Sequence, residues 1–302
     1  ENSIAVLDAA MELGMSHIDT SNVYGMGRSE TVIGAYLKDR GAEARDFFHI
    51  ATKGAIRRDP EGGPNFFDNS AEYLTTALEE SLSRLGVECV DLYYVHRREA
   101  TREIEEVTET LAGLVKAGKT KAIGYSEISP ASLMRASEIH PVAAVQSEYS
   151  LATRAPELGL VQRCAELGST LVAFSPVGRS MLSDTPLTFD AVADLAFLKV
   201  NPRFNALNYA ANRKITDGFR ALAAEIGEPT AALAQAWLLH QGDHVIPLPG
   251  TRSVEHLRQL ARGADISLSA DDLARIETVL PVGWAHGDRY SQGQWNGPER
   301  FC

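Results

Sequence analysis

The feature that most constrains this chain is a repeated alternation of two local patterns. Short runs rich in β-branched and aromatic residues are followed by a polar or glycine-bearing loop and then by an amphipathic segment with helical periodicity. Seven such runs occur, at residues 17–19, 48–52, 90–95, 120–124, 143–146, 170–174 and 244–248. Strands that alternate with helices at this spacing predict a parallel sheet with both faces covered.

The segments between these runs predict helices at 71–85, 103–117, 130–138, 158–167 and 229–240. The chain opens inside a further helical segment, 4–10, which needs a strand before it. Seven visible strands plus one absent strand predict an α/β protein, a (β/α)8 TIM barrel whose first strand is missing from the given chain. Because no linker or compositional break divides the chain, we expect one domain over 1–302. Strand counting alone leaves an open doubly wound sheet as the alternative.

Three longer stretches interrupt the alternation, at 57–69, 179–208 and 281–302. Insertions of this kind on the C-terminal side of a barrel commonly form the walls of a substrate site. The alternative is that they are solvent-exposed segments that take no part in a substrate site.

The composition of the chain limits the kinds of partner that it is expected to bind. The net charge is −11 without a basic stripe, which argues against a nucleic acid and against an anionic membrane surface. No apolar run is long enough to cross a bilayer. Cys89, Cys164 and Cys302 form no CxxC pair, so free thiols in a reducing cytoplasm are expected. These observations favour a cytoplasmic protein with a small-molecule ligand; the oligomeric state cannot be read.

Reactive side chains fall where the predicted strands end. Asp19 ends the first run, Tyr24 follows five residues later, Lys53 comes at the end of the second run and His96 at the end of the third. In a barrel these four side chains converge on the mouth where catalytic groups are expected.

The four residue types together suit carbonyl reduction. A phenol has a pKa near 10, too high for ready proton exchange at neutral pH, and a neighbouring ammonium lowers it. Asp19 would keep Lys53 charged and in place, which makes Tyr24 a usable general acid towards a carbonyl oxygen. His96 would donate to the same oxygen and orient the substrate.

Each residue has a simpler explanation when taken alone. Asp19 could cap a helix, Lys53 could be a surface charge and His96 an ordinary loop residue. Their joint placement at strand ends favours a site.

Two other chemistries use the same residues. A metal-dependent hydrolase could employ His17, Asp19, Lys53 and His96, but the last predicted strand offers no metal ligand, so we expect no metal. A Schiff-base aldolase could use Lys53, but Asp19 beside it would raise the pKa of the amine and weaken the nucleophile.

Several segments resemble those of aldo-keto reductases, in order and over essentially the whole chain. The segment 17–25 (HIDTSNVYG) is similar to the family's Asp…Tyr-Gly motif, 50–53 (IATK) to its lysine strand and 91–96 (DLYYVH) to its histidine strand. The resemblance continues through 124–127 (GYSE), 146–150 (QSEYS), 173–176 (AFSP) and 247–251 (PLPGT). The nearest branch is that of bacterial and plant reductases with Ser-Glu after the fifth strand.

The resemblance implies a role for each matched residue. Tyr24 would be the general acid that Lys53 and Asp19 tune, and His96 would orient the carbonyl. Ser126 and Gln146 would bind the nicotinamide carboxamide, and Phe174 would pack against the nicotinamide ring. The pyrophosphate would lie along the loop that contains Ser175, Val177 and Arg179.

The adenosine end would be held by 250–260, which begins with Gly250. Arg252 is placed to pair with a 2′-phosphate, so the resemblance favours NADP(H) over NAD(H); a surface charge is the alternative for this arginine. Gln259 and Leu260 stand where the family has Glu-Asn, and Glu127 stands where other branches have Asn.

These observations predict an NADP(H)-dependent oxidoreductase that converts aldehydes or ketones to alcohols, or the reverse. Trp284 and Trp295 in the last irregular stretch suggest an apolar or ring-bearing carbonyl substrate. The alternative from another functional class is a nicotinamide-binding regulatory or sensor protein with little turnover.

Overall fold

All seven predicted strands are present in the structure, a computed structural model that describes residues 2–58 and 66–301. They are β1 (His17–Asp19), β2 (His49–Gly54), β5 (Val90–Val95), β6 (Thr120–Ser126), β7 (Ala144–Glu148), β8 (Thr170–Phe174) and β9 (Val245–Leu248). The chain divides into two compact units. Unit 1 comprises 2–146, 162–170 and 297–301, and unit 2 comprises 147–161 and 171–296.

Unit 1 contains consecutive parallel strands in the order β1-β2-β5-β6-β7. Ile18 is in register with Ile50 in the first pair of strands, and Ser126 is in register with Gln146 in the last. Because the strands are parallel, their C-terminal ends lie at one edge of the sheet. That edge carries Asp19, Lys53 and the residues that follow β5 and β6.

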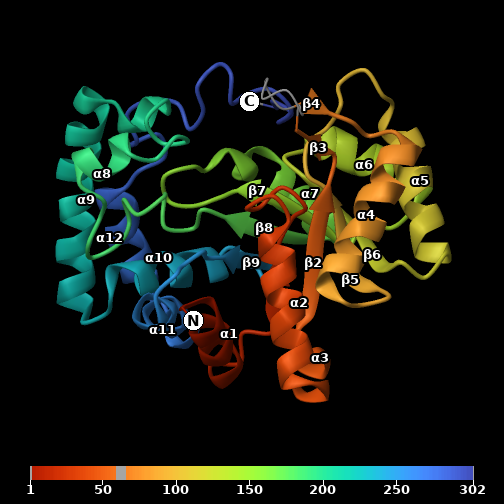
Figure 1. The fold of residues 1–302 in the computed structure, drawn as a ribbon. Helices are drawn as coiled ribbons and strands as arrows, with labels where there is room; N and C mark the ends of the chain where they lie inside the picture. Colours follow the sequence, from red (N-terminus) through yellow and green to blue (C-terminus); the bar gives the residue numbers. More distant parts are fainter. Residues whose placement is uncertain (1, 59–65, 302) are drawn as a thin grey trace. The chain divides into compact units, whose positions relative to one another are not determined.

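The helices of unit 1 lie against these strands. They are α1 (Asn2–Glu12), α2 (Arg28–Arg40), α3 (Ala42–Phe47), α4 (Ala71–Leu85), α5 (Ile104–Lys116) and α6 (Pro130–Ile139), while α7 (Leu160–Leu167) begins in unit 2 and continues in unit 1. Figure 1 shows α4 and α5 beside β2, β5 and β6. In α4 the Ser70 hydroxyl caps the first turn, and Leu74, Leu78 and Leu85 are buried at helical spacing.

Helices α2 and α4 approach each other closely at Gly34. A Cβ atom added to Gly34 would lie 2.3 Å from the carbonyl oxygen of Arg84, a backbone atom that cannot move alone. Beside this contact, buried Glu30 accepts hydrogen bonds from Arg84 Nε at 2.6 Å and Thr52 Oγ1 at 2.5 Å. The absence of a side chain at Gly34 and the Glu30–Arg84 ion pair together fix the position of α2 against α4 and β2.

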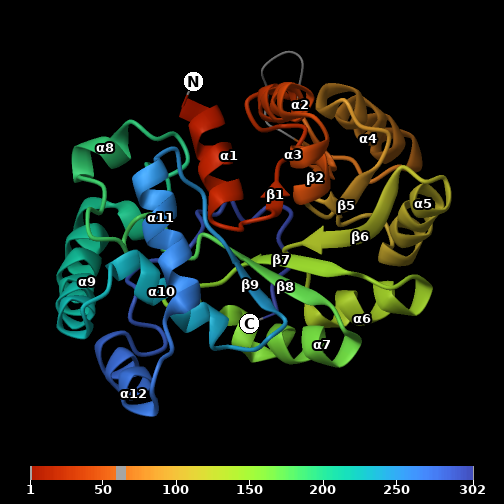
Figure 2. The same ribbon diagram turned by 90° about the horizontal axis from the view of Figure 1, so that it is seen from below.

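Unit 2 contains the parallel pair β8–β9, with Val172 in register with Ile246. Its helices are α8 (Phe189–Ala193), α9 (Ala206–Ile226), α10 (Thr230–Leu239), α11 (Val254–Arg262) and α12 (Ala270–Val279), with 3-10 turns η1 (Ala155–Leu158), η2 (Pro202–Phe204) and η3 (Gly263–Asp265). Helix α10, buried along nearly its whole length, contacts α9, α11 and β9, as can be followed in Figure 2.

The irregular stretches are only partly as expected. The first contains an antiparallel pair of two-residue strands, β3 (Ile56–Arg57) and β4 (Phe66–Phe67). Residues 59–65 lie outside the described residues. The second contains α8, η2 and the start of α9, so the expectation of irregular structure throughout 179–208 is wrong. Thr188, Asn201 and Asn205 cap α8, η2 and α9, respectively, with their side chains. No helix or strand forms in 281–301.

Over the described residues, none of the helices has the length and apolar character required to cross a bilayer.

We predict that Gly34→Ala lowers the free energy of unfolding by about 3 kcal/mol, because the new methyl group overlaps backbone atoms of α4. Gly113→Ala is the matched control, since Gly113 lies inside α5 and no described atom is within 4 Å of the added Cβ. That variant should be about 0.5 to 1 kcal/mol more stable than the wild type. Urea unfolding followed by far-UV circular dichroism measures both; equal stability of the two variants would contradict the proposed close packing.

Candidate active site

Lys53 lies at the centre of the predicted site, with its side chain fully buried in unit 1. Its Nζ atom donates to Asp19 Oδ1, to the carbonyl oxygen of Thr20 at 2.9 Å and to Tyr24 Oη at 3.4 Å. An ammonium group has three protons, so these three acceptors match its donors in number. The predicted contact between Lys53 and Tyr24 is present.

Burial by itself would lower the pKa of Lys53. The negative charge of Asp19 and the contact with Tyr24 outweigh burial, and the pKa is raised above its ordinary value. Lys53 is therefore an ammonium at neutral pH, which suits a cation that stabilises an anion on a neighbour and does not suit a nucleophilic amine.

Tyr24 lies in the turn after β1, where its backbone N–H donates to the carbonyl oxygen of Ser21 at 3.1 Å. Lys53 Nζ is 4.9 Å from the centre of the Tyr24 ring, and the His96 ring lies edge-on at 5.7 Å. The Tyr24 side chain is nevertheless 41% exposed. Tyr24 is thus the member of the group that a substrate can reach from solvent.

His96 follows β5 directly, and its backbone N–H donates to the carbonyl oxygen of Gly54 at 3.0 Å. Burial, reinforced by the positive charges of Arg97 and Lys53, holds the pKa of His96 well below its ordinary value. The imidazole is therefore neutral at neutral pH, with a proton on one ring nitrogen and a lone pair on the other. Ser21 Oγ lies 3.1 Å from Nδ1.

Ser126 and Gln146 occupy matching positions on β6 and β7, next to the charged group. Gln146 Nε2 donates to Asp19 Oδ2 at 2.8 Å, and Arg97 Nη1 donates to Ser126 Oγ at 3.0 Å. The structure thus brings the Gln146 amide beside Asp19, with Ser126 in register on the neighbouring strand.

Ser21 and Arg97 contact predicted site residues, Ser21 next to His96 and Arg97 on Ser126, but the sequence analysis identified neither of them. Ser21 lies within the matched segment 17–25, two residues after Asp19, and Arg97 directly follows His96. Adjacency to the predicted residues was the signal that could have identified both. Glu127 follows Ser126 with a positive φ of 58°, and its backbone N–H donates to the carbonyl oxygen of Gln146 at 2.8 Å.

The last irregular stretch contributes to both units. In unit 1 the Glu299 N–H donates to the carbonyl oxygen of Glu127 at 2.8 Å, and Glu299 also accepts from Ser129 N at 2.8 Å. In unit 2 the buried Trp284 indole donates to the carbonyl oxygen of Leu151 at 2.7 Å, and Trp295 Nε1 donates to Asp288 at 2.8 Å.

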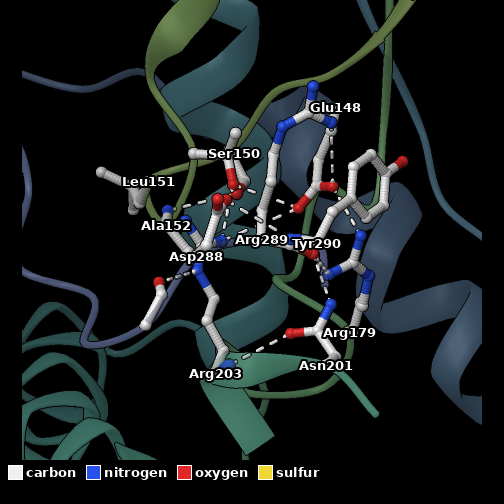
Figure 3. Close-up of polar contacts among 12 residues, drawn as sticks. Glu148, Ser150, Leu151, Ala152, Arg179, Asn201, Arg203, Asp288, Arg289 and Tyr290 are labelled. Atoms are coloured by element: carbon white, nitrogen blue, oxygen red, sulfur yellow. Dashed lines mark hydrogen bonds and ion pairs between the residues drawn. The ribbon is translucent and has the colours of Figure 1, made fainter. Parts of the chain in front are cut away.

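The residues predicted to contact the ring and pyrophosphate of a cofactor belong to unit 2. Phe174 ends β8, and the following loop contains Ser175, with φ of 53°, Val177 and Arg179, with φ of 55°. Figure 3 shows how Arg179 is held: its guanidinium donates to Glu148 Oε2 at 2.5 Å and to the carbonyl oxygen of Arg289 at 3.0 Å.

Glu148 is the centre of a buried charge cluster in unit 2. Besides Arg179, it contacts Arg289 at 3.4 Å and Arg203 at 3.8 Å, and its Oε1 accepts from Thr153 at 3.1 Å. The guanidiniums of Arg179 and Arg203 also donate to backbone carbonyls of the C-terminal segment, and Arg203 donates to Thr153, so the cluster ties that segment to the loop after β8.

Gly250 and Arg252 lie in the exposed segment between β9 and α11. Ser253 caps α11 by accepting from His256 N at 3.3 Å. Leu260, where the family has Asn, is buried in α11, which packs against α10. Packing within unit 2 accounts for an apolar side chain there. Residues 2–58 and 66–301 contain no cluster of three or more His, Cys, Asp or Glu side chains that could hold a metal ion.

The parallel strands, their intervening helices and the Tyr-Lys-Asp-His group at the strand ends of unit 1 are the features that the resemblance to aldo-keto reductases predicted. Comparison with known proteins agrees: the sequence profile of the Aldo/keto reductase family matches residues 1–281, and the chain belongs to this family of oxidoreductases.

Curated relatives support the assignment. "Probable aldo-keto reductase 1" of Glycine max is 38% identical over 302 residues, which are 100% of this chain and 84% of that protein. "Aldo-keto reductase yakc [NADP(+)]" of Schizosaccharomyces pombe is 35% identical over 296 residues, 97% of this chain and 86% of that protein.

A solved structure, that of the glycerol dehydrogenase AKR11B4 from Gluconobacter oxydans, matches with a TM-score of 0.81 and 27% identity. The match covers 92% of this chain and 85% of that one. The predicted fold class, the (β/α)8 barrel of aldo-keto reductases, is confirmed.

We predict that Glu148→Gln destabilises unit 2 by about 3 to 5 kcal/mol, because three nearly buried guanidiniums lose their shared carboxylate. Glu277→Gln is the control, since it breaks a pair with Arg154 in which the Glu277 side chain is 47% exposed, and should cost at most about 1 kcal/mol. All three tryptophans, Trp237, Trp284 and Trp295, belong to unit 2, so their fluorescence during urea unfolding reports this unit. Equal midpoints for the two variants would show that the cluster contributes little.

Proposed function

We propose that the protein is an NADP(H)-dependent reductase that interconverts aldehydes or ketones with alcohols, with Tyr24 as the general acid. The observation that carries the proposal is the single buried ammonium of Lys53, which contacts both Asp19 and Tyr24. The membership of an oxidoreductase family and the glycerol dehydrogenase neighbour support it.

The proton moves at Tyr24 Oη. As a carbonyl carbon is reduced, negative charge develops on its oxygen, and the phenol hydroxyl supplies the proton that this oxygen needs. The phenolate left behind faces the Lys53 ammonium, which stabilises the anion. In alcohol oxidation the same group accepts the proton, so one arrangement supports both directions.

His96 orients the carbonyl in this proposal. Because the ring is neutral, it can donate one hydrogen bond to the substrate oxygen without releasing its proton to solvent. Two groups would then define the position of the oxygen, Tyr24 through its hydroxyl and His96 through a ring N–H. This pair restricts the carbonyl to one orientation.

The side chains beside the charged group fit a nicotinamide. A carboxamide needs both a donor and an acceptor, and Ser126 and Gln146 offer a hydroxyl and an amide at register positions of neighbouring strands. When bound, the cofactor supplies the hydride. Ser126 and Gln146 would hold its carboxamide, Phe174 would pack against its ring, and Ser175, Val177 and Arg179 would lie along its pyrophosphate.

Preference for NADP(H) rests on Arg252. Its side chain lies in the exposed segment just before α11, where a guanidinium can pair with a 2′-phosphate. The Schizosaccharomyces pombe relative carries NADP(+) in its name, which supports the same preference here.

We also propose one barrel domain over 1–302, because the family profile spans both compact units. A cytoplasmic location is supported by the free thiols of Cys89 and Cys164; Cys302 lies outside the described residues.

Replacing the proposed acid tests the reaction. Tyr24→Phe removes the proton that Tyr24 gives to the carbonyl oxygen, so we expect kcat to fall about a hundredfold to ten-thousandfold. NADPH oxidation with a panel of aldehydes, ketones and sugars measures this loss, and fluorescence titration with NADPH should show unchanged cofactor affinity. Tyr36→Phe is the control, since that hydroxyl donates to Asp8 in another part of unit 1 and its loss should leave turnover unchanged. Full activity in Tyr24→Phe would mean that another group supplies the proton.

Replacing Arg252 tests cofactor preference. We expect Arg252→Gln to raise the KM for NADPH about tenfold to a hundredfold and to leave the KM for NADH unchanged, because only NADPH carries the 2′-phosphate. Arg262→Gln is the control, because it removes the same charge from the far end of α11, where Arg262 pairs with Glu228. A similar change for both cofactors would show that Arg252 does not contact the 2′-phosphate.

A further inference from the structure

Ser21 lies inside the site but has no role in the proton transfer described above. Its side chain is fully buried in the turn between β1 and Tyr24. Its Oγ atom lies 3.1 Å from His96 Nδ1, and 3.3 Å from both the carbonyl oxygen of Lys53 and Asn22 Oδ1. We infer that Ser21 is a positioning residue: its hydroxyl donates to His96 Nδ1 and thereby keeps the ring proton on Nε2.

The surrounding hydrogen bonds decide which atom receives the Ser21 proton. The carbonyl oxygen of Lys53 already accepts from the N–H of Asn22 at 3.2 Å. Asn22 is only partly buried, so water can satisfy its Oδ1 atom. His96 Nδ1 is buried, and among the described residues Ser21 is its hydrogen-bond partner. The distance from Ser21 Oγ to His96 Nδ1 is also shorter than its distances to the carbonyl oxygen of Lys53 and to Asn22 Oδ1.

The opposite arrangement gives poorer hydrogen bonds around Ser21. If Nδ1 carried the ring proton, Ser21 Oγ would have to accept from His96 and also from the N–H of Val23, which lies at 3.4 Å. The serine proton would then turn to the carbonyl oxygen of Lys53, which already has a donor, or to Asn22, and both of these oxygens lie farther from Oγ than Nδ1 does.

The tautomer decides what His96 can do in the reaction. Nε2 is on the opposite side of the ring from Nδ1, so a proton there is available to a ligand oxygen, whereas a lone pair would repel it. This inference rests on the proposed function for its catalytic meaning, but the tautomer is a property of the protein alone. The charges that face the ring, those of Lys53 and Arg97, are both positive and favour the neutral ring in either tautomer.

The tautomer is measured by long-range proton–nitrogen correlation NMR on protein labelled with 15N-histidine. The chain has eight histidines, and His96→Gln identifies the signals of His96 by their loss. We expect wild-type His96 as the Nε2–H tautomer near neutral pH. Observation of the Nδ1–H tautomer in the wild type would overturn the inference without any variant of Ser21.

Two variants separate positioning from folding. Ser21→Ala removes the donor, so we expect the signals of His96 to shift towards the Nδ1–H form. Ser21→Cys keeps a similar volume with a weaker donor and should give an intermediate shift, which also covers a failure of the alanine variant to fold. Ser81→Ala, at another fully buried serine of unit 1 that contacts Arg84, should leave the His96 signals unchanged.

Turnover provides the second readout. We expect Ser21→Ala to lower kcat roughly tenfold to a thousandfold, because the donor to the substrate oxygen is lost in part of the molecules, and to leave the KM for NADPH unchanged. An unchanged tautomer in Ser21→Ala would refute the inference even if kcat fell. Absence of carbonyl reduction in the wild type would instead refute the proposed function, and the NMR result would still stand by itself.

Discussion

The ammonium group of Lys53 lies wholly out of solvent, and much of unit 1 is arranged to make this possible. A buried ammonium without partners would cost many kcal/mol. Its three partners are Asp19 at the end of β1, and the carbonyl oxygen of Thr20 and the hydroxyl of Tyr24 in the turn that follows β1. Burial of one charge therefore fixes the register of β1 against β2, the course of the turn and the position of the tyrosine.

Unit 2 contains a second buried charge cluster, in which three arginines surround Glu148. The remaining donors of Arg179 and Arg203 bond to backbone carbonyls and to Thr153 (Figure 3). That cluster joins segments distant in the sequence. The Lys53 group differs in one respect: it ends in Tyr24, whose side chain is 41% exposed. Chemistry requires a group that a substrate can reach, whereas the charges of the second cluster hold segments of unit 2 together.

The sequence was sufficient to predict elements whose formation is local. The strands at 17–19, 90–95 and 170–174 and the helix at 71–85 have the predicted bounds, because alternation, a serine cap and a C-terminal glycine specify them. The grouping of Asp19, Tyr24, Lys53 and His96 could be predicted because parallel strands bring their C-terminal ends to one edge. Helix α8 could not, since its five residues carry little periodicity, and the contact of Ser21 with His96 depends on how the turn after β1 meets the end of β5.

In the proposed reaction, the electrostatics of the site give different tasks to the two groups at the substrate oxygen. Burial and the positive charges of Arg97 and Lys53 disfavour a protonated His96 ring. A neutral imidazole is a poor acid, so it can hold an oxygen by a hydrogen bond throughout the reaction without giving up its proton. The same ammonium acts in the opposite sense on Tyr24, where it favours the anion left after proton transfer. One buried cation would thus separate the two proposed roles, proton transfer at Tyr24 and orientation at His96, through the sign of the charge that each group would carry.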